Sequence, residues 1–381
     1  MRPFTLLIKP ACADCNLDCT YCFYARKAGL YPESAAHRMS DKVLTRLVQG
    51  YMATPQPQYV FGWQGGEPTL MGVEFFRRVT ELQTASGGPG AVVANGLQTN
   101  GTLLTDELAA HFAKYRFLVG VSLDGPPELH DRFRLSHDGR ATHASVLQGL
   151  DVLRRNSVEY NILTLVSAAN VGHGRDVYRY LRDRELYFHQ YIPCVEFDER
   201  GAPLPVAITG RQWGDFLCAV FDEWLKRDTR KVSVRLFDCV LARLAGEPHS
   251  LCHMERDCCQ YFVVEWNGDV YPCDFFVQSD LRLGNIMHDS WEDLLASPVY
   301  REFGRRKSSW NACCAKCRHL TLCAGDCLKH RLVPGNDPTR LSWLCAGWRQ
   351  FYDHALKDLR RLADQYVAER RLAATEHRRM V

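Results

Sequence analysis

Cysteine is distributed unevenly along this chain, and its distribution limits how the chain can fold. Of the 17 cysteines, four lie between residues 12 and 22 and ten lie between residues 252 and 345. The first residues contain only a short apolar stretch and no small-residue cleavage site, so we expect a cytoplasmic protein whose thiols stay reduced. Disulfides are then disfavoured, and both groups of cysteines are expected to bind metal.

The overall composition fits a globular protein and argues against several functional classes. Hydrophobic residues make up 46% of the 381 positions, charged residues make up 24%, and the net charge is +3. No segment approaches the roughly 20 consecutive apolar residues that a membrane-spanning helix needs. The basic C-terminal segment is typical of a solvated helix face. We therefore expect neither a membrane nor a nucleic-acid partner.

The first 230 residues alternate between strand-like and helix-like patterns, which is typical of βα units and a parallel sheet. The predicted strands are residues 5–9, 59–64, 92–99, 117–124, 160–167 and 188–194. Two predicted helices begin at the caps Ser40 and Thr105, and each carries an apolar stripe. Six βα units are fewer than the eight of a TIM barrel, so we predict an α/β fold with a partial (β/α)6 barrel, open on one side.

The pattern changes after about residue 246, where regular structure becomes sparse and metal sites must hold the chain together. Residues 261–273 form a predicted hairpin whose Asn267-Gly268 pair suits a two-residue type I′ turn. Ser290 and Asp293 resemble a capping box at the start of a short helix, and a long helix is expected from about residue 340. The predicted domains are the barrel at 1–235, a cysteine-rich domain at 236–350 and a C-terminal helix at 351–381.

Three of the first four cysteines are spaced as Cys15-x3-Cys19-x2-Cys22, directly after the first predicted strand. A structural zinc site normally has four ligands in paired C-x2-C turns, and three thiolates fit this arrangement poorly. Three thiolates on a 4Fe–4S cluster would instead leave one iron open to a small chelating ligand. Cys12 could be a fourth ligand, and the residues alone leave open both this alternative and zinc.

The spacing is similar to the motif that defines the radical S-adenosylmethionine (SAM) enzymes, in which the open iron chelates the amino and carboxylate groups of SAM. The segment "GWQGGEP" at 62–68 resembles the glycine-rich segment that holds the SAM amino group in that family. The resemblance implies Cys15, Cys19 and Cys22 as cluster ligands. The residues that it implies at the SAM site are Tyr21, Gly65, Gly66, Glu67, Ser122, Arg134 and Val195.

The later cysteines resemble the SPASM extension of radical SAM enzymes, which carries two auxiliary 4Fe–4S clusters with full cysteine ligation. The connectivity of that family implies one cluster on Cys252, Cys258, Cys273 and Cys327. It implies the other cluster on Cys314, Cys317, Cys323 and Cys345. Cys259 and Cys313 each adjoin an implied ligand, so either could replace its neighbour. Two zinc sites are the alternative that the spacing alone leaves open.

These segments, together with "LQTNG", "VSLDG" and "YPCDFF", resemble the anaerobic sulfatase-maturating enzymes from about residue 5 to residue 350. Such enzymes oxidise a cysteine or serine of a sulfatase polypeptide to Cα-formylglycine. The resemblance implies that a 5′-deoxyadenosyl radical from SAM removes a hydrogen atom from Cβ and that Asp274 acts as general base. Gln64, Tyr24 and Asn100 are predicted to bind the peptide backbone.

The expected substrate is a sulfatase polypeptide in unfolded or nascent form, because a side chain of a folded protein could not reach a barrel interior. An electron donor such as ferredoxin or flavodoxin is expected, and we expect a monomer. Two other functions are alternatives: a radical SAM/SPASM enzyme that crosslinks a ribosomally made peptide, and a zinc-stabilised binding module. Asp274 favours the maturase, because dehydrogenation needs a base. The sequence does not choose between cysteine-type and serine-type substrates.

Overall fold

The computed structural model describes residues 1–32, 34, 36–332 and 336–380. Packing divides the chain into two compact units, each made of two segments. The first consists of Met1–Leu163 and Asp257–Lys307, and the second of Thr164–Arg256 and Ser308–Val381. This division reflects how residues pack and does not show which segments bind a cofactor. The domain boundaries expected from the sequence therefore stay a prediction. Within the described ranges, no helix is both long enough and apolar enough to cross a membrane.

The first unit is built on a sheet in which the strand order is β10-β9-β8-β1-β2-β3-β4-β5. Its strands are β1 (Thr5–Lys9), β2 (Tyr59–Trp63), β3 (Val93–Thr99), β4 (Leu118–Ser122), β5 (Glu159–Val166, which ends in the second unit), β8 (Tyr261–Glu265), β9 (Asp269–Tyr271) and β10 (Gly284–Asn285). Each neighbouring pair from β1 to β5 is parallel, so the carboxyl ends of these strands lie at one edge. These five predicted strands are confirmed.

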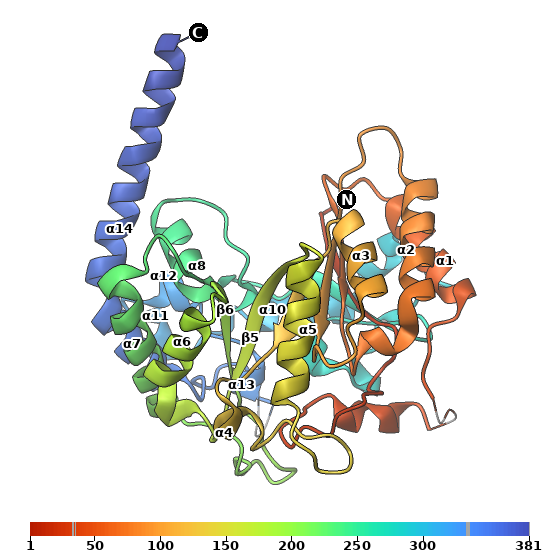
Figure 1. The fold of residues 1–381 in the computed structure, drawn as a ribbon, viewed down its shortest axis with the longest axis horizontal. Helices are drawn as coiled ribbons and strands as arrows, with labels where there is room; N and C mark the ends of the chain where they lie inside the picture. The colour runs from red at the N-terminus through yellow and green to blue at the C-terminus, as the bar shows by residue number, and fades with distance from the viewer. Residues whose placement is uncertain (33, 35, 333–335, 381) are drawn as a thin grey trace. The chain divides into compact units, whose positions relative to one another are not determined.

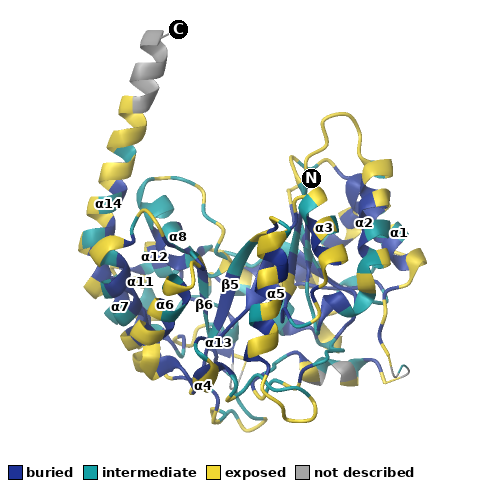
Figure 2. Ribbon diagram, viewed as in Figure 1, coloured by how far each residue is buried: buried dark blue, intermediate teal, exposed yellow. Residues whose placement is uncertain are grey.

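Helices follow most of these strands. They are α1 (Asp41–Met52), α2 (Gly72–Ser86), α3 (Asp106–Lys114), α4 (Pro127–His130), α5 (His143–Arg155), α9 (Trp291–Ala296) and α10 (Pro298–Arg306), with the 3-10 helices η1 (Ala25–Leu30), η2 (Pro68–Met71), η5 (Asp274–Phe276) and η6 (Ser279–Leu281). The predicted caps are confirmed, since the Ser40 and Thr105 side chains accept hydrogen bonds from the first turns of α1 and α3. α2 packs against both α1 and α3 (Figure 1), and the buried stripes of these helices appear dark blue in Figure 2.

The predicted hairpin exists, and it extends the sheet of the first unit. β8 pairs antiparallel with β9 and parallel with β1, which places Lys9 opposite Glu265. The predicted type I′ turn is wrong. Gly268 N donates to Glu265 O at 2.9 Å, so Asn267 is a central residue of the turn and Gly268 is its last. A type I′ turn requires positive φ at both central residues, which were predicted to be Asn267 and Gly268. Gly268 has a φ of 91°, but Asn267 is not among the described residues with positive φ.

Two short helices follow the hairpin where one was predicted. Ser290 and Asp293 form the expected capping box at the start of α9. The helical stretch divides at Ser297, because Pro298 begins α10 and has no backbone N–H to continue the hydrogen bonding of α9.

The second unit contains β6 (Phe188–Pro193) and β7 (Ser233–Val234), which are parallel neighbours. Its helices are η3 (Val171–His173), α6 (Gly174–Asp183), α7 (Gly210–Arg227), α8 (Arg235–Leu244), η4 (Cys252–Met254), α11 (Ala312–Ala315), α12 (Leu320–Cys323), α13 (Lys329–Leu332) and α14 (Cys345–Met380). The backbones of α7 and α14 approach closely, since a Cβ atom on Gly347 would lie 2.0 Å from Gly210 O. Glycine at this crossing permits the contact. The sixth predicted strand and the long C-terminal helix are confirmed.

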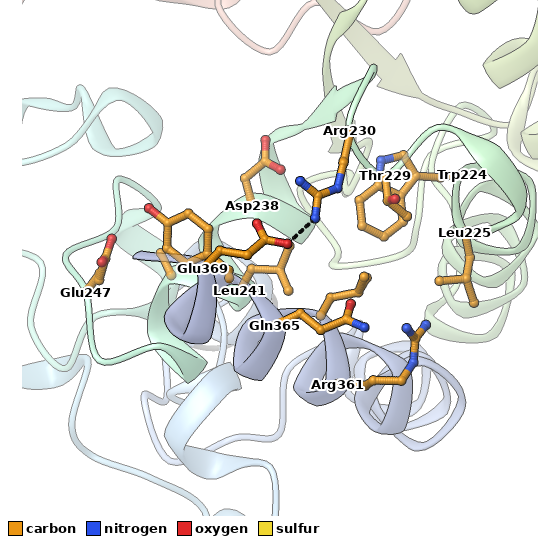
Figure 3. Close-up of a pocket in the computed structure, with 13 residues that line it drawn as sticks. Trp224, Leu225, Thr229, Arg230, Asp238, Leu241, Glu247, Arg361, Gln365 and Glu369 are labelled. Atoms are coloured by element: carbon orange, nitrogen blue, oxygen red, sulfur yellow. Dashed lines mark hydrogen bonds and ion pairs between the residues drawn. The ribbon is translucent and has the colours of Figure 1, made fainter. Parts of the chain in front are cut away.

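A cavity of about 520 Å³ opens among α7, α8 and α14 in the second unit (Figure 3). An ion pair between Arg230 and Glu369 joins the loop after α7 to α14 at this cavity. None of the residues that the sequence predicts to bind a cofactor, metal or substrate lines it.

Candidate active site

The loop that carries the first cysteines follows β1 and is held by a neighbouring segment. Cys15, Cys19 and Cys22 are partly buried, whereas Cys12 is fully buried. The loop backbone donates two hydrogen bonds, 2.8 and 3.0 Å long, to carbonyl groups of residues 133–135. The cysteine loop is therefore fastened to the segment that contains Arg134.

The glycine-rich segment after β2 packs directly against the cysteine loop. Gly66 N donates to Cys12 O at 2.7 Å, and Glu67 N donates to Asp14 O at 2.8 Å. A Cβ atom on Gly66 would lie 1.9 Å from Asp14 O, and one on Gly65, whose φ is 139°, would lie 2.7 Å from Cys12 O. Only glycine permits this approach at the two positions.

Glu67 is fully buried and ties the glycine-rich segment to β3 and the loop that follows it. Its Oε1 accepts hydrogen bonds from both donors of Thr69 and from the Thr99 hydroxyl, and its Oε2 accepts one from Asn100 N at 2.7 Å. Burial raises the pKa of Glu67, although these donors act in the opposite direction. Because protein groups occupy both oxygens, Glu67 is suited to hold the segment in place.

The three thiols of the motif have the burial and proximity that cluster ligands need. Burial raises the pKa of Cys15 to about 11 and that of Cys19 to about 12. The charge of Cys22 raises the pKa of both thiols further, whereas the charge of Arg134 lowers the pKa of Cys19. Cysteines bind metals as thiolates, so loading this site must release protons. The group fits a cluster held by three cysteines.

A buried ion pair lies beside this loop. Arg134 Nε donates to Asp124 Oδ2 at 3.1 Å, and the Tyr21 hydroxyl donates to the same oxygen. The Arg134 guanidinium also lies 5.6 Å from the centre of the Tyr21 ring. His130 Nδ1 accepts from Asp124 N at 3.2 Å, which fixes the backbone of Asp124. Ser122, at the end of β4, is buried two residues earlier.

Asp274 begins η5 and contacts side chains from the ends of β1 and β2. Gln64 Nε2 donates to Asp274 Oδ2 at 3.0 Å, and the Lys9 ammonium forms an ion pair with Asp274 Oδ1. The Asp274 side chain is 15% exposed and that of Lys9 is 2% exposed. The pairing of β8 with β1 brings the hairpin to β1, although Asp274 follows Gln64 by 210 residues in the chain.

The other two residues predicted to bind the peptide are buried in the first unit. The Tyr24 hydroxyl donates to Glu265 Oε1. Asn100 Nδ2 donates to Asn16 Oδ1 at 2.8 Å and lies 3.6 Å from Cys15 Sγ. Both side chains have protein partners, and their contact with a peptide stays a prediction.

In the second unit, one predicted set of auxiliary ligands lines a single cavity of about 410 Å³. The set is Cys314, Cys317, Cys323 and Cys345. Burial raises the pKa of Cys345, and the charges of Cys314 and Cys317 raise it further, so these thiols lie near one another. The set fits a second cluster. Exposed Cys313 lines the same cavity as its neighbour Cys314.

The other auxiliary set is divided between the two units. Cys258 and Cys273 belong to the first unit, and Cys252 and Cys327 to the second. The Cys259 thiol lies 3.4 Å from Tyr300 O in α10, whereas the Cys273 thiol lies 3.4 Å from the Tyr261 hydroxyl. Val195, predicted at the adenine of SAM, is fully buried in the second unit. These assignments stay predictions.

Within the residues that the structure describes, no three Cys, His, Asp or Glu side chains are arranged to hold one metal ion. Cluster ligands do not need that arrangement, because each thiolate binds a different iron atom of the cluster.

Comparison with known proteins identifies the family. Residues 11–180 match the Radical SAM superfamily, and residues 252–318 match SPASM, an iron-sulfur cluster-binding domain. The chain is 36% identical over 371 residues to the serine-type anaerobic sulfatase-maturating enzyme of Bacteroides thetaiotaomicron. The match covers 93% of this chain and 89% of that protein. The chain belongs to the anaerobic sulfatase-maturating enzyme family. It is also 34% identical over 368 residues to the cysteine-type anaerobic sulfatase-maturating enzyme of Clostridium perfringens, with 96% of this chain and 99% of that protein covered.

A solved structure, "Native anSMEcpe with bound AdoMet and Kp18Cys peptide", has the same fold as this family member. The two match with a TM-score of 0.88 and 34% identity, over 96% of this chain and all of the other. The predicted fold, a radical SAM partial barrel with a SPASM domain, is confirmed, as are its cofactors, SAM and 4Fe–4S clusters. Peptide crosslinking and the zinc-stabilised module are not favoured.

Three residues at the site of this family member escaped the sequence analysis. Lys9, Asp124 and Glu265 are buried charged groups that contact predicted site residues. Lys9 and Glu265 are the last residues of β1 and β8, and Asp124 lies two residues after the end of β4. A charge at the end of an apolar run was the signal available.

Proposed function

We propose that this enzyme oxidises a cysteine or serine side chain of a sulfatase polypeptide to Cα-formylglycine. The observation that carries the proposal is the Asp274 carboxylate, which Lys9 and Gln64 hold in the same unit that contains the three-cysteine loop and its glycine-rich partner. A base beside a radical site is what a dehydrogenation requires. The relatives named above are maturases of both the serine type and the cysteine type.

In this proposal Cys15, Cys19 and Cys22 hold the cluster that binds SAM. When bound, this cluster and SAM supply a 5′-deoxyadenosyl radical that removes a hydrogen atom from Cβ of the target residue. The backbone of Gly65 and Gly66, in the segment that Glu67 fixes, would hold the SAM amino group. The other SAM-site residues in the proposal are Tyr21, Ser122, Arg134 and Val195.

Arg134 suits the carboxylate of SAM because its planar guanidinium can form parallel charge-assisted hydrogen bonds. Its ion pair with Asp124 and its contact with Tyr21 hold it in one orientation. The Arg134 side chain is only 11% exposed, so its ion pair with Asp124 is buried and is not a surface contact. This burial supports a role in ligand binding.

Asp274 takes the proton from the target thiol or hydroxyl as the Cβ–heteroatom double bond forms. A serine substrate then gives the aldehyde directly, whereas a cysteine substrate gives a thioaldehyde that water hydrolyses to the aldehyde with release of hydrogen sulfide. One electron must also leave, and we assign its path to the auxiliary clusters. The proposed ligands of one cluster are Cys252, Cys258, Cys273 and Cys327. The proposed ligands of the other are Cys314, Cys317, Cys323 and Cys345.

The proposed substrate is an unfolded or nascent segment that enters extended, so that Gln64, Tyr24 and Asn100 can meet its backbone. The proposed electron donor is a small redox protein such as ferredoxin or flavodoxin, and the proposed state is a cytoplasmic monomer. A solved relative that binds a peptide together with AdoMet supports a peptide substrate.

Anaerobic reconstitution with iron, sulfide, SAM and reductant tests the proposal, using peptides of the form C-x-P-x-R and S-x-P-x-R. We expect about 12 iron atoms per chain, four for each of three clusters, with formation of deoxyadenosine and of an aldehyde on the peptide. Comparison of the two peptides determines the substrate type. Cleavage of SAM with only a crosslinked peptide would overturn the proposal, and a colourless protein with bound zinc would overturn the cofactor assignment.

A further inference from the structure

Both carboxylate oxygens of Asp274 are held by side chains of the first unit. Gln64 Nε2 donates to Oδ2 at 3.0 Å, and the Lys9 ammonium contacts Oδ1. A carboxylate held at both oxygens has a fixed plane, so the direction from which it accepts a proton is set before a substrate arrives. The Gln64 amide therefore already donates a hydrogen bond to Asp274, in addition to the contact with a peptide that is predicted for it.

Lys9 is buried to a degree that is rare for lysine. It ends the strand "TLLIK" with 1% exposure, and its Cδ lies 3.3 Å from the point where a Cβ on Gly65 would be. Lys9 therefore lies directly against the glycine-rich segment. A buried ammonium is strongly unfavourable unless an opposite charge compensates it, so Lys9 needs a carboxylate beside it.

Two carboxyl groups compete for this charge. Glu265 is opposite Lys9 in the sheet and is fully buried, and its Oε1 accepts from the Tyr24 hydroxyl. Burial raises the pKa of Glu265, against smaller opposing effects of Tyr24 and Lys9. The Lys9 ammonium also lies 4.3 Å from the centre of the Tyr24 ring, which is a favourable cation–π contact. The ion pair of the Lys9 ammonium is with Asp274 Oδ1, so Asp274 is the counter-ion of Lys9.

We propose that Lys9 is a positioning residue for proton transfer, which holds the Asp274 carboxylate in one orientation through their buried ion pair; this inference rests on the proposed function. In that step the target thiol or hydroxyl gives its proton to Asp274. The Cβ hydrogen atom goes to the deoxyadenosyl carbon, and one electron leaves to an iron–sulfur acceptor.

Loss of Lys9 therefore acts on one part of the reaction. Hydrogen abstraction does not use Asp274, so deoxyadenosine continues to form, whereas aldehyde formation needs a correctly placed base. In Lys9→Met holoenzyme we expect the ratio of deoxyadenosine to formylglycine to rise about tenfold or more, since small misplacements can cost about 10²-fold. The peptide KM changes by less than about twofold, because the peptide does not bind Lys9.

Two further variants separate positioning from general damage. Lys9→Arg keeps a cation and should recover part of the wild-type ratio. Lys42→Met makes the same substitution at an exposed lysine of α1 and should leave the ratio within about twofold of wild type. A wild-type ratio in Lys9→Met, or an equal rise in Lys42→Met, would overturn the inference.

The melting temperature of the holoenzyme provides a readout that does not depend on turnover. We compare Lys9→Met, Asp274→Asn and the double variant. If the two residues form the ion pair, the double variant melts higher than the sum of the single shifts predicts, because neither buried charge is left alone. Additive shifts would contradict the inference. If Lys9→Met does not fold, Lys9→Gln takes its place in both measurements. Absence of aldehyde from the wild-type enzyme counts against the proposed function, whereas the melting comparison still decides whether Lys9 and Asp274 form the ion pair.

Discussion

Asp274 loses its basicity but keeps its shape when it is replaced by asparagine. We expect Asp274→Asn to lower formylglycine formation by about 10² to 10⁴-fold, the usual contribution of a general base. Deoxyadenosine should still form, because the radical step does not use this carboxylate. Mass spectrometry of the peptide and chromatography of the nucleoside measure both products.

Asp280→Asn is the matched control, because Asp280 is exposed in the neighbouring helix η6. It should retain wild-type activity. Full aldehyde formation by Asp274→Asn would remove Asp274 from the role of base.

Arg134 offers a second test, of SAM binding alone. Lysine keeps the positive charge but cannot contact Asp124 and a carboxylate with one planar group. We expect Arg134→Lys to weaken SAM binding about tenfold or more, since a hydrogen bond to a charged group contributes roughly 1.5 to 3 kcal/mol. Equilibrium dialysis of the reconstituted enzyme measures the affinity. Exposed Arg132 is the control, and an equal loss in Arg132→Lys would show that the effect is not specific to Arg134.

For single residues, the sequence reveals a role where neighbouring positions in the chain indicate it. The spacing of Cys15, Cys19 and Cys22 is visible without a structure, and so is an aspartate next to a cysteine. Lys9 and Glu265 carry only a charge at the end of an apolar strand, which does not name their partners, because each contacts residues more than 200 positions away.

The glycine-rich segment yields a prediction about one structural element. A methyl group on Gly66 would lie 1.9 Å from Asp14 O, so alanine must push the segment away from the cysteine loop. We expect Gly66→Ala to lower the free energy of unfolding by about 1 to 3 kcal/mol and to reduce the iron bound after reconstitution. Thermal unfolding and iron analysis measure the two effects.

Gly88 is the control for this change, because a Cβ there meets nothing within 4 Å. Gly88→Ala should change the free energy of unfolding by no more than about 0.5 kcal/mol. Equal iron content in Gly66→Ala and wild type would contradict the proposed packing role of Gly66.

Strands and helix caps were predictable because their signals are local. The apolar runs gave the first six strands, and Ser40, Thr105 and Ser290 cap helices as expected. The pairing of β8 with β1 was not predictable, since two apolar strands far apart in the chain carry no mark of their partner. The hairpin turn failed for a related reason: the strand register, which depends on the whole sheet, placed Gly268 at the end of the turn.

At the scale of the whole molecule, the cysteine-lined cavity of the second unit should depend on its metal. The helices α11, α12 and α13 have four residues each, too few to be stable alone. We expect iron removal by a chelator under anaerobic conditions to expose residues 308–332 and 336–345 to proteases, while α1, α2 and α5 stay protected. Limited proteolysis with mass spectrometry locates the cuts. Identical cleavage before and after iron removal would contradict a structural role of this cluster.

Composition along the chain suggests consecutive domains, whereas the compact units are discontinuous. Asp257–Lys307 packs with Met1–Leu163, and it does so through β8, whose partner strand lies at the other end of the chain. A change of pattern along a sequence can mark a boundary but cannot show that a segment returns to an earlier unit.

The pairing of β8 with β1 also sets an order in time. Gln64 and Asp274 are 210 residues apart, and at roughly 5 to 20 residues per second the ribosome delivers Asp274 about 10 to 40 s after Gln64. During that interval the cysteine loop can pack on its glycine partner, but the ammonium of Lys9 has no counter-ion from Asp274. The arrival of the hairpin then supplies the base and neutralises the lysine in one event, so the site gains its charge balance and its reactivity together.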